Sequence, residues 1–365
     1  MLMRAQIGQL FVFGFDGTEV TPHLRRLITE YHIGGLILFR HNAHDVEQVW
    51  RLLAALAEIR PDIPTAIFID EEGGPVSRLP SPVLRLPPMR VLGHGGSAAL
   101  CFEIGTVLGR ELSALGVHVN LAPVVDVDTF KANPVIGPRA LHEAPARVAS
   151  LGAALMRGLH RGGVTGCPKH FPGHGDTTVD SHHALPTITH DMERLESCEL
   201  IPFRRVIAAG ARMLMTAHLL LEAYDPIHPV TLSPYLLPKM IRQQLGFEGL
   251  VISDDLGMAA TAERYTPGET MALGIAGAVD LFLLRGDEQR QLEFVEAAIR
   301  LAEHDPGARA RMAERAGRVL AWKRRHLRRE QRASAPKDLT ALFASERRAA
   351  LVRRIEALSE SGNSV

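Results

Sequence analysis

The stretch GLVISDDLGM, residues 249–258, runs an unbroken apolar segment directly into two adjacent acids. Three other short runs are apolar in the same way: AIFID at 66–70, MLMTA at 213–217 and DLFLL at 280–284. A strand that alternates in polarity is covered on one face only, whereas a continuous apolar strand is covered on both. The pattern therefore indicates a parallel sheet packed between helices.

Eight strand candidates of this kind alternate with helical segments, and the order predicts parallel strands joined by helices. The strands are expected at 10–15, 35–39, 65–70, 118–125, 164–169, 213–217, 250–253 and 280–284. The helices are expected at 22–31, 45–59, 98–115, 145–161, 191–209, 234–245, 267–276, 288–304 and 309–326.

An open doubly wound sheet is the structural alternative, but no glycine-rich dinucleotide fingerprint follows the first strand. We therefore predict an α/β fold, a single-domain (β/α)₈ TIM barrel over residues 1–330. A C-terminal helical extension is expected over 331–365, and its polar end, SESGNSV at 359–365, is expected to fray.

Composition argues against several classes of protein. Basic and acidic residues number 41 each, so the net charge gives no electrostatic case for nucleic acid or a membrane surface as partner. The three cysteines are too few and too scattered for a disulfide framework or a thiolate metal site. No apolar run reaches the ~20 residues that span a bilayer, and the N-terminus does not read as a signal peptide. We expect a cytoplasmic protein, a monomer or weak dimer.

Polar clusters follow the ends of the predicted strands. DEEGG at 70–74 follows the third, Asp126 and the stretch 133–139 follow the fourth, KHFPGHGDTTVDSHH at 169–183 follows the fifth, and SDD at 253–255 ends the seventh. In a barrel these ends open on one face, where active sites are built. The sequence thus predicts one site assembled from several loops.

The acids after the seventh strand have two interpretations. A carboxylate held there on rigid backbone suits a nucleophile or an electrostatic stabiliser. Alternatively, Ser253 or Asp254 caps a following helical turn. The motif alone leaves both open.

The loop after the fifth strand also has competing interpretations. Its histidines could bind a metal, but Pro172 and the neighbouring glycines prevent a helical HExxH arrangement. A serine triad would need a GxSxG elbow, which is absent. In the third interpretation Asp180 orients the imidazole of His182 and favours its charged form, giving a proton-transfer dyad. His174 is expected to brace the loop, and His183 to be a bystander.

With these motifs assembled, the sequence resembles the glycoside hydrolase family 3 β-N-acetylhexosaminidases of the bacterial NagZ type. The segment 169–182 follows the family signature K-H-[FI]-P-G-H-G-x-T-x-x-D-S-H without a gap, and IDEEGGPVSRL at 69–79 matches D-x-E-G-G-x-V-x-R-[LF]. Two further blocks, within 120–139 and 251–258, match in the expected order. Pro75 departs from the pattern, since an arginine is common there.

The resemblance implies roles for individual residues. Asp254 matches the catalytic nucleophile, which leaves Asp255 as a cap or brace. His182 matches the acid/base and Asp180 its dyad partner. The residues that match those holding the sugar are Asp70, Arg78, Arg139, Lys169 and His170.

The resemblance also implies an activity. A β-N-acetylglucosaminidase is expected, with retention of configuration and with no cofactor and no metal. Its expected substrate is a muropeptide fragment, from which it removes N-acetylglucosamine attached to 1,6-anhydro-N-acetylmuramyl groups during cell-wall recycling.

Three other functions stay open from the residues. A phosphorylase is possible because a neutral histidine, unlike a carboxylate, does not repel phosphate. A non-catalytic muropeptide-binding barrel would be favoured by loss of the nucleophile or dyad, yet Asp254, Asp180 and His182 are all present. A metal-dependent hydrolase would lose activity on chelation.

Overall fold

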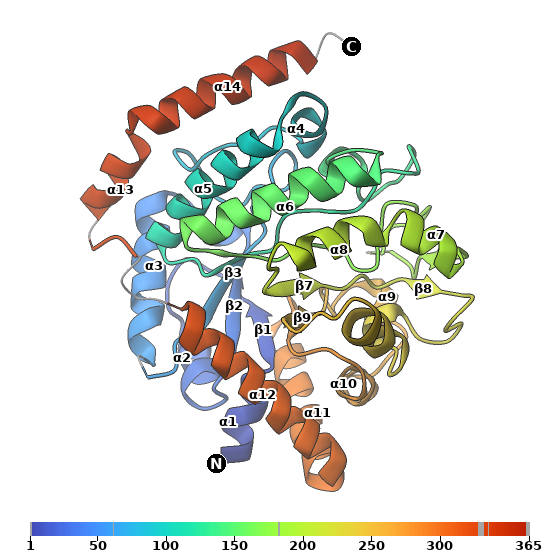
Figure 1. Cartoon of the computed structure of the whole chain (residues 1–365). Coiled ribbons are helices and arrows are strands. Elements are labelled where there is room, and N and C mark those ends of the chain that lie inside the picture. The colour runs from blue at the N-terminus through green and yellow to red at the C-terminus, as the bar shows by residue number, and fades with distance from the viewer. Residues whose placement is uncertain (1, 61, 182, 328–331, 335, 363–365) are drawn as a thin grey trace.

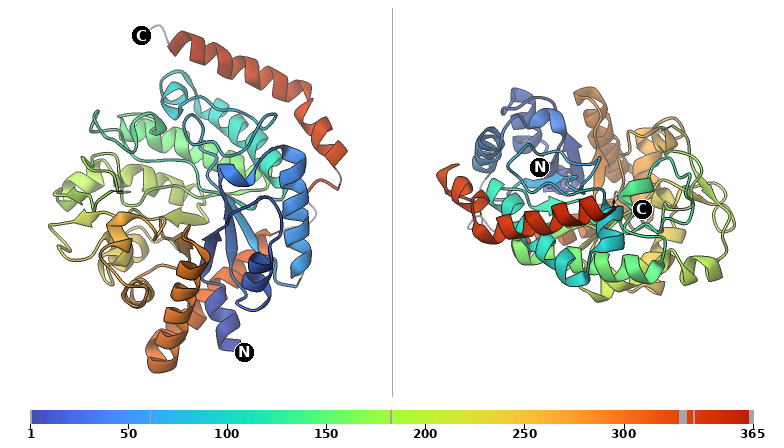
Figure 2. Two further views of the ribbon diagram at one scale, coloured as in Figure 1. Left: turned by 180° about the vertical axis from the view of Figure 1, so that it is seen from behind. Right: turned by 90° about the horizontal axis from the view of Figure 1, so that it is seen from above.

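The structure is a computed structural model that describes residues 2–60, 62–181, 183–327, 332–334 and 336–362. It has an α/β fold in which a parallel sheet is surrounded by helices (Figure 1). The N-terminus and the C-terminal helix lie at opposite ends of the molecule (Figures 1 and 2).

Six strands form the main parallel sheet, in the order β10-β1-β2-β3-β4-β5. They are β1 (Phe11–Gly14), β2 (Gly35–Leu38), β3 (Ala66–Ile69), β4 (Val119–Asn120), β5 (Thr165–Gly166) and β10 (Phe282–Leu284). β7 (Met213–Met215) pairs in parallel with β9 (Leu250–Ile252). Isolated parallel bridges join Phe171 to Thr216 and Ile252 to Leu281, so the β7–β9 pair has a link toward each edge of the six-stranded sheet.

The helices alternate with these strands, as predicted from the sequence. The longer ones are α2 (Pro22–Thr29), α3 (Val46–Ile59), α5 (Ala98–Leu115), α6 (Pro145–Gly162), α8 (Leu200–Ala208), α10 (Pro267–Ala276), α11 (Glu288–His304) and α12 (Pro306–His326). Side-chain caps start several of them; for example, Asp45 accepts from the Gln48 amide at α3, and Thr266 forms a capping box with Glu269 at α10.

All eight predicted strands contain a strand of the structure, although β4 and β5 are only two residues long. The helix predicted over 191–209 is wrong as a single element, because it breaks into α7 (Met192–Ser197) and α8. Pro202 lies in the first turn of α8, where its missing N–H is tolerated, so the helix restarts just before it. The helix expected over 234–245 is a π-helix, η4 (Pro238–Gln244), which again begins at a proline.

Several short elements were not predicted. They are α1 (Leu2–Gly8), α4 (Met89–Gly95), α9 (Ala259–Ala262), and the strands β6 (Thr187–Ile188) and β8 (Leu220–Leu221), which pair only with each other. None is long enough to show a clear hydrophobic period.

A separate apolar cluster lies on one face of the strands. It gathers side chains from every one of the eight predicted strand segments, among them Phe68 of β3 and Ile252 of β9. Val319 and Trp322 of α12 belong to the same cluster, so α12 covers one end of it. The larger cluster lies between the strands and the outer helices.

Two neighbouring outer helices, α5 and α6, pack with their backbones almost in contact. A Cβ added at Gly105 would lie 2.3 Å from the Leu155 carbonyl oxygen, and one at Gly158 would lie 2.3 Å from that of Phe102. Any larger residue at either position would force the helices apart. These glycines therefore set the interhelical distance.

The C-terminal extension forms α13 (Pro336–Phe343) and α14 (Glu346–Gly362), and α14 lies along α4 and α5 (Figures 1 and 2). Arg348 of α14 forms an ion pair of 2.6 Å with the buried Glu111 of α5. The backbone is helical through residue 362, and 363–365 lie outside the described residues. The fraying of 359–365 stays a prediction.

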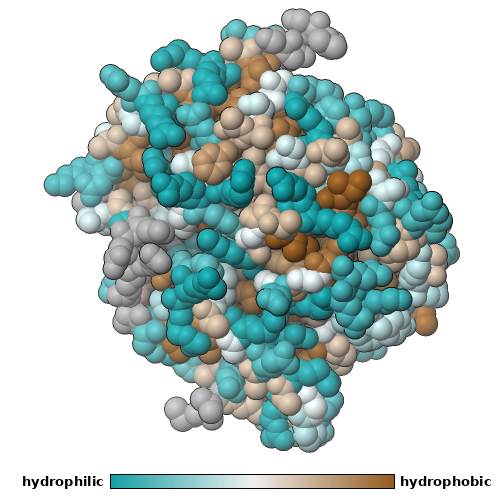
Figure 3. All heavy atoms as spheres, viewed as in Figure 1, coloured by the Kyte–Doolittle hydropathy of each residue, from teal (hydrophilic) through white to brown (hydrophobic). Residues whose placement is uncertain are grey.

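Hydrophilic residues cover most of the face in Figure 3, and hydrophobic ones are exposed only in small areas. Within the described residues no helix is both long enough and apolar enough to cross a membrane.

Candidate active site

A cavity of about 200 Å³ opens at the carboxyl ends of the strands. Its walls come from the segments that follow β2, β3, β4, β5, β9 and β10. Six of the eight residues predicted for the site line it, namely Asp70, Arg78, Arg139, Lys169, His170 and Asp254. Of the other two, Asp180 is described but is not part of the lining, and His182 lies outside the described residues.

Asp254 stands at the end of β9 on firmly held backbone. The preceding residue, Ser253, donates its amide to the Leu281 carbonyl (2.9 Å) and accepts from the Leu283 amide through Oγ (3.0 Å). Asp254 Oδ1 accepts from the Asp255 amide at 2.8 Å. Among the described residues no donor bonds to Oδ2, so this oxygen is open to the cavity.

The electrostatic surroundings keep Asp254 ionised. Burial alone would raise the pKa of its carboxyl, but the nearby His170, His218, the Asp255 amide and Lys169 together lower that pKa below its ordinary value. An ionised carboxylate at neutral pH is the form that a nucleophile needs.

The capping interpretation of Ser253 and Asp254 is wrong, because the next helix, α9, starts at Ala259 and has Met258 at its N-cap. Asp255 is the brace of the pair. Its Oδ1 accepts from the Gly257 amide (2.9 Å) and from the Arg285 amide (3.0 Å), so it ties the end of β9 to the end of β10.

A buried charge cluster forms the opposite part of the wall. Glu72 accepts two hydrogen bonds from Arg139, from Nε and Nη2, at 2.9 Å each. Lys169 Nζ lies 2.7 Å from Glu72 Oε1 and donates to Asp70 Oδ1 at 2.6 Å. Burial opposes the charge on Lys169, but Asp70 and Glu72 more than compensate and raise its pKa. These contacts hold the side chains of Lys169 and Arg139 rigidly in the cavity wall.

Glu72 was assigned no role from the sequence. The ion-pair partner of Arg139 is Glu72. Burial would raise the pKa of Glu72, yet Lys169 and Arg139 hold it well below the ordinary range. A third acid immediately after Asp70 and Glu71 was the available signal.

Arg78 has more unused donors than Lys169 and Arg139. Its Nη2 lies 4.0 Å from Asp70 Oδ2, a distance too long for a hydrogen bond. Its Nε is buried and has no partner among the described residues. Arg78 is therefore free to donate to a ligand.

Asp126, at the bottom of the wall, orients two histidines. It is fully buried and accepts from the ring Nδ1 of His170 at 2.7 Å, and from the backbone amide of His174 at 2.7 Å. Burial would raise the pKa of Asp126, but His170 and His174 lower it. This contact turns His170 so that its Nε2 faces Arg139 (3.4 Å) and the cavity.

His174 braces the loop from the inside. Its Nδ1 lies 2.6 Å from Thr177 Oγ1 and its Nε2 lies 3.2 Å from Ser181 Oγ. Burial lowers the pKa of its ring, which favours the neutral form. Ser181 lines the cavity, and the backbone carbonyl of Asp180 accepts from the His183 amide at 2.9 Å. The loop that carries the predicted dyad thus reaches the cavity at Ser181.

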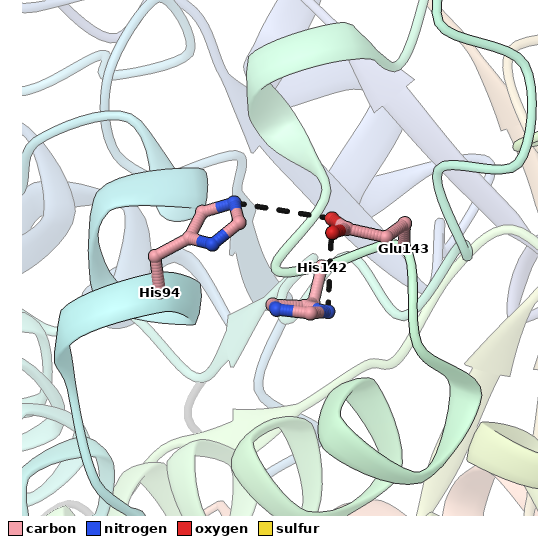
Figure 4. A group of neighbouring side chains, drawn as sticks. All are labelled: His94, His142 and Glu143. Atoms are coloured by element: carbon pink, nitrogen blue, oxygen red, sulfur yellow. Dashed lines mark ion pairs between the residues drawn. The ribbon is translucent and has the colours of Figure 1, made fainter. Parts of the chain in front are cut away.

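One possible metal-binding group occurs among the described residues: His94, His142 and Glu143, whose ligand atoms lie within 4.8 Å of one another (Figure 4). Two of these donors are engaged already. The Ala144 amide donates to His142 Nδ1 at 2.9 Å, and Lys131 Nζ lies 3.7 Å from Glu143 Oε2. None of the three residues lines the cavity, so we give the group no part in its chemistry.

Comparison with known proteins identifies the family of this chain. The chain matches the Glycosyl hydrolase family 3 N terminal domain over residues 2–321. It is 36% identical over 342 residues to a β-hexosaminidase of Chromobacterium violaceum, covering 92% of each chain.

Solved structures are similar as well. A glycoside hydrolase family 3 β-N-acetylglucosaminidase from a Paenibacillus species superposes with a TM-score of 0.88 at 38% identity, over 98% of this chain and 68% of that one. NagZ from Neisseria gonorrhoeae, in complex with N-trifluoroacetyl-D-glucosamine, superposes with a TM-score of 0.77 at 28% identity, over 96% and 97%.

Proposed function

This chain belongs to glycosyl hydrolase family 3 and is a glycoside hydrolase of the β-N-acetylglucosaminidase kind, and we propose that it cleaves its substrate with retention of configuration. Asp254 is the nucleophile, and His182 is the acid/base supported by Asp180. The observation that carries the proposal is the position of Asp254 at the end of β9, in the lining of a cavity whose wall also holds Lys169 and Arg139. The lowered pKa of its carboxyl agrees with this role.

The proposed reaction has two steps. In the first, the Asp254 carboxylate attacks the anomeric carbon while the His182 imidazolium gives its proton to the departing oxygen, which releases the aglycone and leaves a glycosyl-enzyme. In the second, neutral His182 takes a proton from water, the water oxygen attacks the anomeric carbon, and the sugar leaves with its original configuration. Most retaining glycosidases use two carboxylates, and here a histidine would replace one of them.

The number of free donors suggests how the sugar is held. Lys169 spends two of its three N–H donors on Asp70 and Glu72, which leaves one for a sugar hydroxyl. Of Arg78, Lys169 and Arg139, Arg78 has the most donors to spare. Arg139 is largely committed to Glu72, so we propose that it acts mainly by fixing its neighbours and contributes a single contact to the sugar. Asp70 and His170 complete the set.

We also propose that the sheet closes as a (β/α)₈ barrel over residues 1–330. The isolated bridges on both sides of the β7–β9 pair support closure, as does the apolar cluster with members from all eight strand segments. The extension 331–365 would be an addition to that barrel.

For the natural substrate we propose a muropeptide fragment that carries N-acetylglucosamine on a 1,6-anhydro-N-acetylmuramyl group, hydrolysed in the cytoplasm by a monomer or weak dimer. The similarity to NagZ over nearly the whole of both chains supports this choice.

Turnover of 4-nitrophenyl β-N-acetylglucosaminide beside the matching β-glucoside tests the activity. We expect the acetamido sugar to be strongly preferred and Asp254→Asn to abolish its turnover. Exposed Arg300 on α11, outside the cavity lining, offers a control in Arg300→Gln, which should behave as wild type. Comparable turnover of both glycosides, or an Asp254→Asn variant that keeps most of its activity, would contradict the proposal.

A further inference from the structure

A second, larger cavity of about 630 Å³ adjoins the sugar cavity. The two share four lining residues: Phe39, Asp255, Met258 and Arg285. Beyond these, the second cavity is built from the segments after β1 and β10 and from the starts of α2 and α11. Because one of the shared residues directly follows Asp254, a group attached to the anomeric carbon of a bound sugar has a route into this space.

Arg285 stands at the boundary between the two cavities. It directly follows β10, and its backbone is fixed by the hydrogen bond to Asp255 Oδ1 (3.0 Å). Its guanidinium lies over the ring of Phe39, 4.8 Å from the centroid. Gly14 permits this approach, because a Cβ there would lie 3.1 Å from Arg285 Cα and 3.2 Å from the Phe39 ring. The aromatic ring holds the guanidinium in place without using its hydrogen-bond donors.

Those donors have no acceptor among the described residues, and the side chain is exposed. Arginine presents a planar fork that matches a carboxylate with two parallel hydrogen bonds. The position, at the carboxyl end of the last strand of the sheet, is also one where barrel enzymes commonly bind anionic groups.

The acidic residues of the second cavity have partners of their own. Asp16 lies 3.2 Å from His41, and Glu288 lies 3.4 Å from His23. Asp287 caps α11 by accepting from the Arg290 amide at 2.8 Å. Asp16 and Glu288 thus have histidine partners and Asp287 has an amide partner, whereas the Arg285 guanidinium has no hydrogen-bond acceptor among the described residues.

We propose that Arg285, held on Phe39, binds a carboxylate of the aglycone and thereby selects substrates whose leaving group is acidic. This inference rests on the proposed function, and it assigns the second cavity to the aglycone. On the peptide-free form of the proposed substrate, the carboxylate nearest the scissile bond is that of the lactyl ether on the muramyl group. In a muropeptide this carboxyl is an amide to the peptide, and the carboxylates of the leaving group are those of the peptide itself.

Two disaccharides that differ in one group test the proposal. One is N-acetylglucosaminyl-β-1,4-1,6-anhydro-N-acetylmuramic acid with its free carboxylate, and the other is its lactyl methylamide. We expect wild type to show a higher kcat/KM for the acid, and Arg285→Gln to reduce the acid-to-amide ratio by about 10-fold, the range of a charge-assisted hydrogen bond at a partly open site. Arg285→Lys should keep part of the preference, since it retains the charge but not the fork.

The ratio does not depend on the fraction of active enzyme, so a partly unfolded preparation would not imitate the effect. Arg300→Gln, which also removes one exposed arginine, should leave the ratio as in wild type. An unchanged ratio in Arg285→Gln, or equal use of acid and amide by wild type, would overturn the inference. Failure of wild type to cleave the 4-nitrophenyl glycoside would instead overturn the proposed function, so the two failures are distinguishable.

Discussion

Replacing Glu72 by glutamine should destabilise the protein far more than the same change on the surface. Glu72 is 2% exposed and receives two hydrogen bonds from Arg139 and a third contact from Lys169. Removing its charge leaves two buried cations that share Asp70 as counter-ion. Breaking a buried ion pair from one side costs about 3–5 kcal/mol, and we expect the free energy of unfolding to fall by that amount.

Urea denaturation followed by circular dichroism measures this loss from the shift of the midpoint at constant slope. Glu293→Gln is the matched control, because Glu293 also pairs with an arginine, Arg290 at 3.0 Å, but is 41% exposed. That change should cost about 0–1 kcal/mol. Equal losses in the two variants would refute the claim that the cluster is a stabilising, fully paired unit.

The same variant has a defined pH dependence. The pKa of Glu72 in the folded protein is held well below its ordinary value of 4.5. A carboxyl with a depressed folded pKa contributes stability that is present above the unfolded pKa and is lost as the pH falls through the folded pKa. The difference between wild type and Glu72→Gln should therefore be constant near neutral pH and should shrink below about pH 4.5. A difference that grows on acidification would contradict the assignment.

Three further predictions concern other parts of the molecule. His182→Ala and Asp180→Ala should each lose about 10²–10⁴-fold in turnover of a disaccharide, and less with a 4-nitrophenyl leaving group; equal losses with both in the glycosylation step would remove His182 from the acid role. Arg348→Ala should lower the free energy of unfolding by about 1–3 kcal/mol, measured in urea, because it takes the guanidinium partner from the buried Glu111. Burial lowers the pKa of Lys323 from 10.5 to about 7. Between these pH values the unfolded chain binds more protons than the folded protein, so the free energy of unfolding of wild type should rise with pH by about 1.4 kcal/mol per unit relative to Lys323→Met. Equal slopes for the two proteins would contradict this.

The sequence predicted the strands well because both faces of each are covered, and continuous apolar runs are hard to mistake. Boundaries set by proline were less well predicted. Pro202 lies in the first turn of α8 and Pro238 begins η4, each inside a stretch that otherwise reads as one helix. Proline has no backbone N–H and therefore fits best in the first turn of a helix. Both prolines are present in the sequence, but the hydrophobic period that runs across them favours a single helix.

The position of the site could be predicted, but not the pairing of charges within it. Glu71 and Glu72 are adjacent and chemically identical, yet they serve different structures. Glu71 Oε2 accepts from the amides of Arg78 (2.8 Å) and Leu79 (3.0 Å) in its own loop, whereas Glu72 faces Arg139. Successive side chains of an extended segment point to opposite sides, so only the three-dimensional path decides which acid faces the cavity.

Arg285 shows the same limit for binding. In the sequence it is one arginine after an apolar strand, with no motif around it. Its importance depends on Phe39, which follows another strand far away in the chain, and on Gly14, which leaves room for both. Contacts between distant segments of this kind carry no local pattern.

Trapping with a 2-fluoro-2-deoxy glycoside, followed by peptide mass mapping, tests the central claim most directly. The account predicts a single covalent sugar on the carboxylate of Asp254. A label on Asp255 or on any other residue, or complete turnover of a genuine substrate with no trappable intermediate and with inverted configuration, would contradict it.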